Sequence, residues 1–66
     1  MRKIFTNREL EIMEKVVGGK TSKIIGEELF ISKHTVDTHR KRIMAKSNSK
    51  NATELVVFCK THEIGF

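Results

Sequence analysis

The chain has a single cysteine, Cys59, and it lacks proline, tryptophan and tyrosine. One cysteine cannot form an intrachain disulfide, which argues against the class of small secreted proteins stabilised by cross-links. No run of apolar residues approaches the ~20 needed to cross a bilayer, and the N-terminus has no apolar signal core. We therefore expect a cytoplasmic protein that has no membrane partner.

The histidines and the cysteine are too scattered for a metal site. They occur at positions 34, 39, 59 and 62, without the paired spacing of a structural zinc centre. The histidines also have no visible nucleophile or carboxylate partners of the kind that a catalytic site needs. A core of this size rarely supplies more than about 3 to 5 kcal/mol, which leaves little to support a strained cavity. We predict one domain over residues 1–66, with no cofactor, no metal and no enzymatic activity.

Positive charge is concentrated in the second half of the chain. The formal net charge is +5, and residues 33–66 hold seven basic and three acidic side chains. Most of this excess lies in the stretch 33–46. A solvated helix face is one interpretation of such a run, and a polyanionic partner such as nucleic acid is the other. Charge alone does not decide between them.

Capping residues and apolar spacing predict an all-α fold of four helices. Thr6 to Glu9 matches the capping box, and Gly18 and Gly19 end the helix that follows. The apolar stripe of this first helix is expected to comprise Leu10, Met13, Val16 and Val17. The predicted helices are 7–17, 22–29, 33–46 and 52–61.

The second and third predicted helices form a helix-turn-helix, because a short helix is followed by a tight turn and a basic helix. Gly26 is either a weak helix residue or a point of close backbone approach, and we favour the second. On the third helix, Val36 and Ile43 recur on one side, whereas Thr38 and Lys41 fall near the opposite side. Short polar and basic side chains with few obstructions suit a helix that lies in the DNA major groove.

Five motifs together resemble the LuxR-type helix-turn-helix domain, which ends quorum-sensing regulators and response regulators of the NarL/FixJ kind. They are TNREL (6–10), GKT (19–21), IGEELFIS (25–32), TVDTH (35–39) and IMAK (43–46). The resemblance implies sequence-specific binding of double-stranded DNA, as the effector domain of a bacterial transcriptional regulator. It also implies a homodimer on DNA through the fourth helix. Members of the family usually carry an N-terminal regulatory domain as well.

The resemblance also assigns contacts by position. It implies base contacts by Asp37, Thr38 and Lys41. It implies phosphate contacts by Lys20, Thr21, Ser32, Lys33, Thr35 and Lys46. Many members have lysine or arginine in place of Asp37, whose carboxylate can instead accept from cytosine N4 or orient Lys41 through an i, i+4 pair. We favour the orienting role.

Two further features keep an alternative function open. Ser47, Asn48 and Ser49 stand where the family usually has leucine, glycine and an aliphatic residue, which suggests either a softened joint or a site completed by another subunit. Val57 points away from the core stripe of the fourth helix and is the candidate dimer contact. Asp37 and Val57 also favour the alternative of a protein-interaction module that uses the helix-turn-helix fold.

Overall fold

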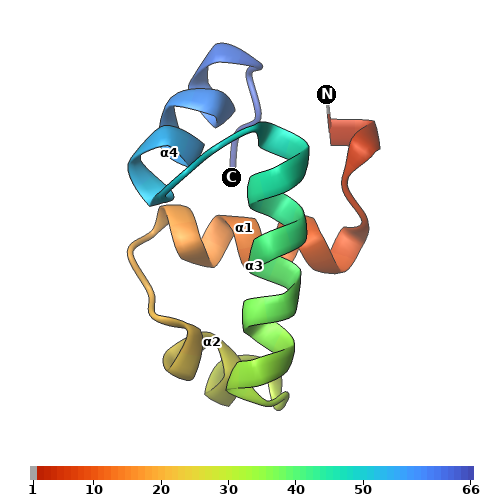
Figure 1. Cartoon of the computed structure of the whole chain (residues 1–66), viewed down its shortest axis with the longest axis vertical. Helices are drawn as coiled ribbons and strands as arrows, with labels where there is room; N and C mark the ends of the chain where they lie inside the picture. The colour runs from red at the N-terminus through yellow and green to blue at the C-terminus, as the bar shows by residue number, and fades with distance from the viewer. Residues whose placement is uncertain (1) are drawn as a thin grey trace.

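The computed structural model describes residues 2–66, and Met1, the first residue of the predicted domain, lies outside the described residues. A short 3-10 turn, Arg2–Ile4, precedes four helices: α1 (Asn7–Val17), α2 (Ser22–Leu29), α3 (Lys33–Ser47) and α4 (Ala52–Thr61) (Figure 1). The described residues form no strand, so the prediction of an all-α, four-helix fold is confirmed. Helix α3 continues one residue beyond its predicted end, because Ser47 keeps the helical conformation and its hydroxyl donates to the Ile43 carbonyl.

The start of every helix is set by its own capping side chain. Thr6 Oγ1 accepts from the Glu9 amide at 3.0 Å, and Glu9 Oε1 accepts from the Thr6 amide at 2.9 Å, which completes the predicted capping box. Side chains of Thr21, Ser32 and Asn51 accept in the same way from amides of α2, α3 and α4. These local bonds explain why the helix starts were predictable.

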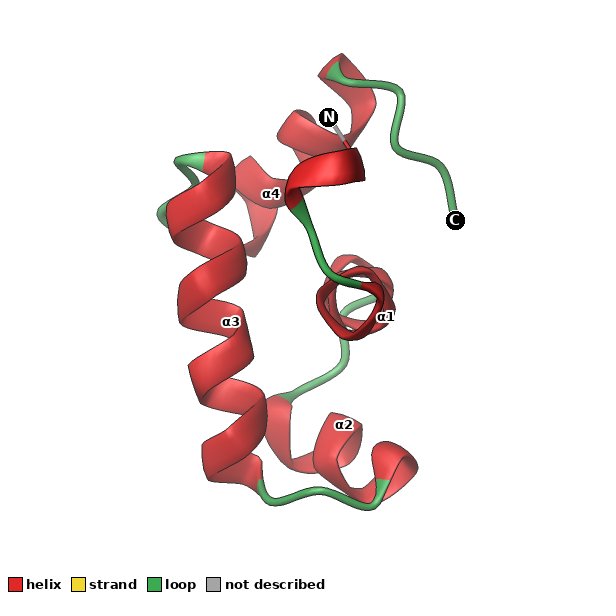
Figure 2. Cartoon of the chain, turned by 90° about the vertical axis from the view of Figure 1, so that its right-hand side faces the viewer, coloured by secondary structure: helices red, strands yellow, loops and turns green. Residues whose placement is uncertain are grey.

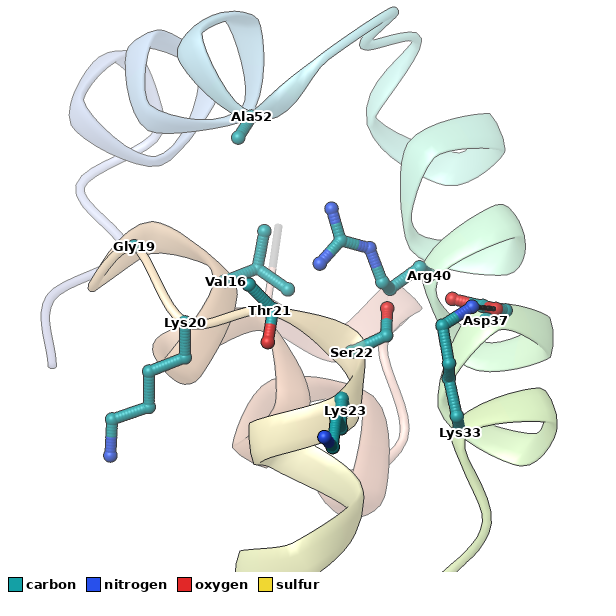
Figure 3. Close-up of a pocket in the computed structure, with 10 residues that line it drawn as sticks. All are labelled: Val16, Gly19, Lys20, Thr21, Ser22, Lys23, Lys33, Asp37, Arg40 and Ala52. Atoms are coloured by element: carbon teal, nitrogen blue, oxygen red, sulfur yellow. Dashed lines mark hydrogen bonds and ion pairs between the residues drawn. The ribbon is translucent and has the colours of Figure 1, made fainter.

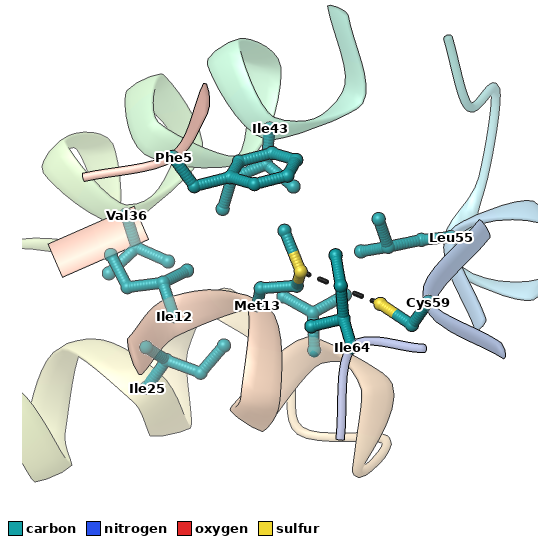
Figure 4. Close-up of a cluster of buried hydrophobic side chains, with 10 residues drawn as sticks. Phe5, Ile12, Met13, Ile25, Val36, Ile43, Leu55, Cys59 and Ile64 are labelled. Carbon is teal, nitrogen blue, oxygen red and sulfur yellow. Dashed lines mark hydrogen bonds between the residues drawn. The ribbon is translucent and has the colours of Figure 1, made fainter. Parts of the chain in front are cut away.

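Helix α3 is the longest element, and the other three helices pack along it. Helix α1 crosses α3 and is seen end-on in Figure 2, while α2 lies beside the start of α3 and α4 beside its end. All four helices contribute to one buried core (Figure 4). Its buried members are Phe5, Ile12, Met13, Val16, Ile25, Val36, Ile43, Leu55, Cys59 and Ile64. This core faces one side of α3 and leaves the other side to solvent.

The buried side of α1 differs from the predicted stripe. Leu10 and Val17 are only half-buried, whereas Ile12 is completely buried and Glu9 is 2% exposed. Met13 and Val16 are buried as predicted, but the buried side extends to Ile12 and Glu9, so that a carboxylate faces inward. The predicted stripe did not include Glu9, because an unpaired buried carboxylate is unfavourable. In the structure Glu9 has a partner, Lys46, which lies 37 positions away in the sequence.

Gly26 is a point of close backbone approach, as predicted. A Cβ atom added there would lie 2.7 Å from the Ile31 carbonyl oxygen and 3.4 Å from the Lys33 amide nitrogen. The Ile31 amide also donates to the Gly26 carbonyl at 3.0 Å. The close neighbour is thus the turn and the first residue of α3. Any larger residue at this position would push α2 and α3 apart.

Three helices are followed by a residue in the left-handed conformation, and none of the three is glycine. Phe30 (φ 58°), Asn48 (φ 52°) and Glu63 (φ 55°) follow α2, α3 and α4 respectively. Asparagine tolerates this conformation, whereas phenylalanine and glutamate adopt it rarely. Phe30 is in addition 95% exposed, so its ring gains no burial from the strained turn.

The exit from α3 is polar but fully bonded. Ser47 and Ser49 are both buried, and their hydroxyl oxygens lie 2.9 Å apart. Ser47 Oγ donates to the Ile43 carbonyl at 2.8 Å. The hydroxyls that replace apolar residues of the family therefore find partners within this chain. Their hydrogen bonding does not need another subunit to complete it.

Candidate nucleic-acid interface

The side of α3 that faces away from the core carries Thr38 and Lys41. Lys41 is exposed and forms no ion pair with the described residues. Thr38 Oγ1 donates to the His34 carbonyl at 3.1 Å, which fixes the hydroxyl and leaves its oxygen able to accept. Ala45, one turn beyond Lys41, is also exposed. This side of the helix is free of covering elements, as a helix that enters a groove requires.

A groove of about 460 Å³ runs beside that face, between α2, α3 and the loop before α2. Three of the sequence-predicted phosphate contacts, Lys20, Thr21 and Lys33, lie in it together with Asp37. Figure 3 shows these side chains around the groove. The full lining is Val16, Gly19, Lys20, Thr21, Ser22, Lys23, Lys33, Asp37, Arg40 and Ala52.

Sequence reasoning missed Ser22, Lys23 and Arg40 as members of this groove. The guanidinium of Arg40 extends from α3 toward Val16 and Ala52 (Figure 3). The position of Arg40 could have been predicted from the sequence, because Lys33, Asp37 and Arg40 are spaced so that they share one face of a helix. The groove itself could not be predicted from the sequence, because it forms only when α2 and α4 pack beside α3.

Asp37 is paired with Lys33 rather than with Lys41. Its Oδ2 accepts from Lys33 Nζ at 2.9 Å, across one turn of α3. A hydrogen bond from the Ser22 side chain, followed by that from Lys33, lowers the pKa of Asp37 below its usual range. Ser22 belongs to α2, so the carboxylate is drawn toward α2. The predicted orienting pair with Lys41 therefore does not form, because the carboxylate is already held on the other side.

Lys20 is held by Glu28 across the α1–α2 loop. Lys20 Nζ donates to both carboxylate oxygens of Glu28, at 2.9 and 2.7 Å, and Lys15 Nζ donates to the same group at 2.7 Å. Hydrogen bonds from Lys15 and then from Lys20 lower the pKa of Glu28. All three side chains are partly exposed. The arrangement fixes the loop that leads into α2 and places Lys20 at the edge of the groove.

Lys46 lies outside this groove, against Glu9. Its Nζ donates to Glu9 Oε1 at 2.6 Å and lies 5.9 Å from the centre of the Phe5 ring. Burial on its own would raise the pKa of Glu9, but hydrogen bonds from Lys46 and from the Thr6 amide outweigh it and lower the pKa. The Lys46 side chain is 35% exposed. Lys46 therefore ties α3 to α1, whatever other contact it makes.

The hydroxyls of Ser32 and Thr35 lie at the start of α3, 2.8 Å apart. Ser32 Oγ also accepts from the Thr35 amide at 3.0 Å. Neither residue lines the groove beside α2. They form a separate polar cluster at the tip of the helix, where unpaired amides of the first turn attract anions.

Val57 is 58% exposed on α4, as predicted, and it lines a second groove of about 360 Å³ between α4 and the exit of α3. Phe58, in the same groove, makes an edge-to-face contact with Phe5, with the ring centres 6.1 Å apart. An exposed aliphatic side chain beside a half-buried aromatic one is a small apolar surface on which a second chain could pack.

Two further properties concern the chain from Arg2 onward. None of its helices combines the length and the apolar character that a membrane crossing demands. Nor do its histidine, cysteine and carboxylate side chains gather in a group of three or more that could hold a metal ion.

Comparison with known proteins gives a consistent result. Residues 3–59 match the model of a family described as bacterial regulatory proteins, luxR family. The chain is 42% identical over 59 residues to the transcriptional regulatory protein LiaR of Bacillus subtilis, and it covers 28% of that protein. It is 45% identical over 56 residues to the oxygen regulatory protein NreC of Staphylococcus epidermidis, covering 26% of it. The matches take in 89% and 85% of this chain respectively, and the chain spans less than a third of its relatives' length.

Proposed function

The chain belongs to the luxR family of bacterial regulatory proteins, and from this membership we propose that it is the DNA-binding domain of a transcriptional regulator, with α3 in the major groove. The observation that supports this most is the open side of α3, with Thr38 and the unpaired Lys41, next to a groove lined by basic side chains. At 1.5 Å per residue, α3 is about 22 Å long, a length suited to the groove.

Base reading is assigned to the outer side of α3. Lys41 can donate to guanine O6 or N7, and the Thr38 oxygen can accept from a base amino group while its methyl contacts thymine. Asp37, the third position that the family resemblance implies, borders this face from the side of the groove. A good bidentate pair between a side chain and a base contributes about 1 to 3 kcal/mol of discrimination, which is the upper range for these contacts.

Phosphate contacts are assigned to two places. Lys20, Thr21 and Lys33 would bind the phosphates of one DNA strand along the groove beside α2. Ser32 and Thr35 would bind backbone phosphates at the start of α3, and Lys46 would bind a phosphate from the last turn of the helix. These contacts release counterions and supply affinity that does not depend on sequence.

The family's relatives suggest how the domain is used. Because LiaR and NreC are more than three times as long as this chain, we propose that it acts as the effector domain of a protein with a further regulatory domain. One domain covers a single half-site, so useful specificity requires two copies. Val57 and the groove along α4 are the proposed homodimer contact.

The test is a gel-shift titration against duplexes selected from a random pool and against unselected duplex. Lys41→Ala and Thr38→Ala should each weaken binding to the selected duplex by about tenfold or more, with a smaller effect on unselected duplex. Lys60→Ala is the matched control, because Lys60 is an exposed lysine on α4 that lines neither groove. Equal losses on both duplexes would show that Thr38 and Lys41 supply charge or fold without reading bases.

A protein-interaction module is the second candidate, and Phe30 favours it. Its ring is 95% exposed at the turn between α2 and α3, where a partner protein would gain apolar contact by covering it. If the chain showed no salt-sensitive binding to any duplex, this second function would replace the first.

A further inference from the structure

The groove beside α2 already contains an anion of its own. Among the described residues, four cationic side chains line it, Lys20, Lys23, Lys33 and Arg40, and Asp37 is the one acidic side chain that does so. Asp37 Oδ2 is 2.9 Å from Lys33 Nζ, and Ser22, at the start of α2, lines the same groove. Phosphate groups of a DNA backbone bind to the same kinds of group: an ammonium, a hydroxyl and the amides at the start of a helix.

We propose that Asp37 limits the affinity for DNA by occupying, with its carboxylate, the place in this groove that a backbone phosphate would otherwise take. The proposal rests on the proposed function and adds to it a residue that acts against binding. A phosphate that approaches Lys33 must share it with the carboxylate, and the two anions repel each other. Because every duplex has the same backbone, the effect is the same for all sequences.

This role differs from the two that the sequence suggested for Asp37. A contact with cytosine N4 would favour particular sequences, and a pair with Lys41 would position a base-reading side chain. The carboxylate instead faces Ser22 and Lys33, on the groove side of α3 (Figure 3). Its side chain is 40% exposed, so an approaching phosphate can reach its surroundings. The geometry therefore assigns it to the backbone rather than to the bases.

The central experiment compares Asp37→Asn with the unaltered 66-residue chain at about 0.1 M salt. Asparagine keeps the shape and removes the charge. Affinity for selected and unselected duplex should rise by the same factor, about threefold, as expected for one screened charge near a phosphate. The slope of log affinity against log salt should steepen by about 0.9, because Lys33 becomes free to neutralise one more phosphate.

Glu11→Gln is the matched control. Glu11 forms a comparable exposed pair with Arg8 at 3.0 Å on α1 and does not line the groove beside α2. Its removal changes the net charge by the same amount. Because Glu11 does not line this groove, its removal should raise affinity by clearly less than removal of the Asp37 charge. Equal gains from Glu11→Gln and Asp37→Asn would overturn the proposal, since the effect would then be one of total charge.

The role of Lys33 is tested by repeating the Asp37→Asn change in a chain that already carries Lys33→Ala. In Lys33→Ala, the change Asp37→Asn should raise affinity by less and should leave the salt slope unchanged, because the lysine that it would release is missing.

Two other results would also overturn the proposal. A loss of affinity for selected duplex alone would make Asp37 a base contact, and an unchanged affinity for both duplexes would show that the carboxylate does not meet the backbone. Failure of the proposed function would be recognised separately, because the unaltered chain would then show no salt-sensitive binding.

Discussion

The two ends of α3 each hold a lysine paired with a carboxylate, yet the two pairs differ in burial. Near the end of the helix, Lys46 meets Glu9, which is 2% exposed. At its start, Lys33 meets Asp37, whose side chain is 40% exposed. A buried pair is strongly destabilising to break, whereas an exposed one contributes little to stability. The Lys46–Glu9 pair therefore stabilises the fold. The Lys33–Asp37 pair instead changes the charge that the surface of α3 presents.

The largest expected effect comes from Lys46→Ala. It leaves the buried Glu9 carboxylate without its cation and with only the hydrogen bond from the Thr6 amide. After allowance for the partial exposure of Lys46, we expect a loss of about 2 kcal/mol in the free energy of unfolding. For a domain of this size the midpoint should fall by about 10 °C. Thermal unfolding followed by circular dichroism measures it. A midpoint within 2 °C or so of the parent would mean that Glu9 is solvated in this variant, and the contrast between the two pairs would disappear.

A smaller effect is expected on acidification. The pKa of Glu9 is lowered in the folded state, so the unfolded chain takes up this proton more readily than the folded chain. The stabilisation by the pair is complete above the ordinary pKa of 4.5 and is lost as the pH falls through the lower folded value. Urea unfolding at a series of pH values measures this.

The control for acidification is Glu9→Gln, which cannot titrate at that position. The pKa values of Asp37 and Glu28 are lowered as well, so part of the acid sensitivity should remain in this variant. The difference between the two curves isolates Glu9. Parallel curves would contradict a stabilising role for its ionised form.

The smallest effect on stability is expected from Lys33→Ala and Asp37→Asn. Exposed pairs one turn apart contribute little, because both groups keep most of their hydration. The unfolding midpoint of either variant should match that of the parent within experimental error, while DNA binding changes. A clear loss of stability would show that the Ser22 contact of Asp37 joins α2 to α3 structurally, and the two ends of α3 would then be alike.

The helix boundaries were predictable because their causes are local. Thr6, Thr21, Ser32 and Asn51 each bond an amide three residues ahead, and such short-range signals can be read directly from the sequence. The open side of α3 followed from helical spacing in the same way. The close approach at Gly26 was also predictable, because a second helix follows almost at once after the helix that contains this glycine.

Contacts between residues far apart in the sequence were not predictable. The buried face of α1 includes Glu9 only because Lys46, 37 positions later, reaches it. Arg40 became a groove residue only through the packing of α2 and α4. The partner of Asp37 was misjudged for another reason: Lys33 and Lys41 lie four positions before and after it, so spacing alone does not choose between them, and the structure pairs it with Lys33. The roles in DNA binding of Asp37, Thr38 and Lys41 remain predictions, and so do those of the phosphate contacts.

The left-handed residues after α2 and α4 bear on how the domain can evolve. Glycine adopts this conformation freely, so Phe30→Gly and Glu63→Gly could each stabilise the chain by up to about 1 kcal/mol. Most substitutions destabilise a protein, and a domain as small as this one has little stability to lose. Glycine at these two positions would therefore provide a reserve of stability, which would allow substitutions on the outer side of α3 without loss of the fold.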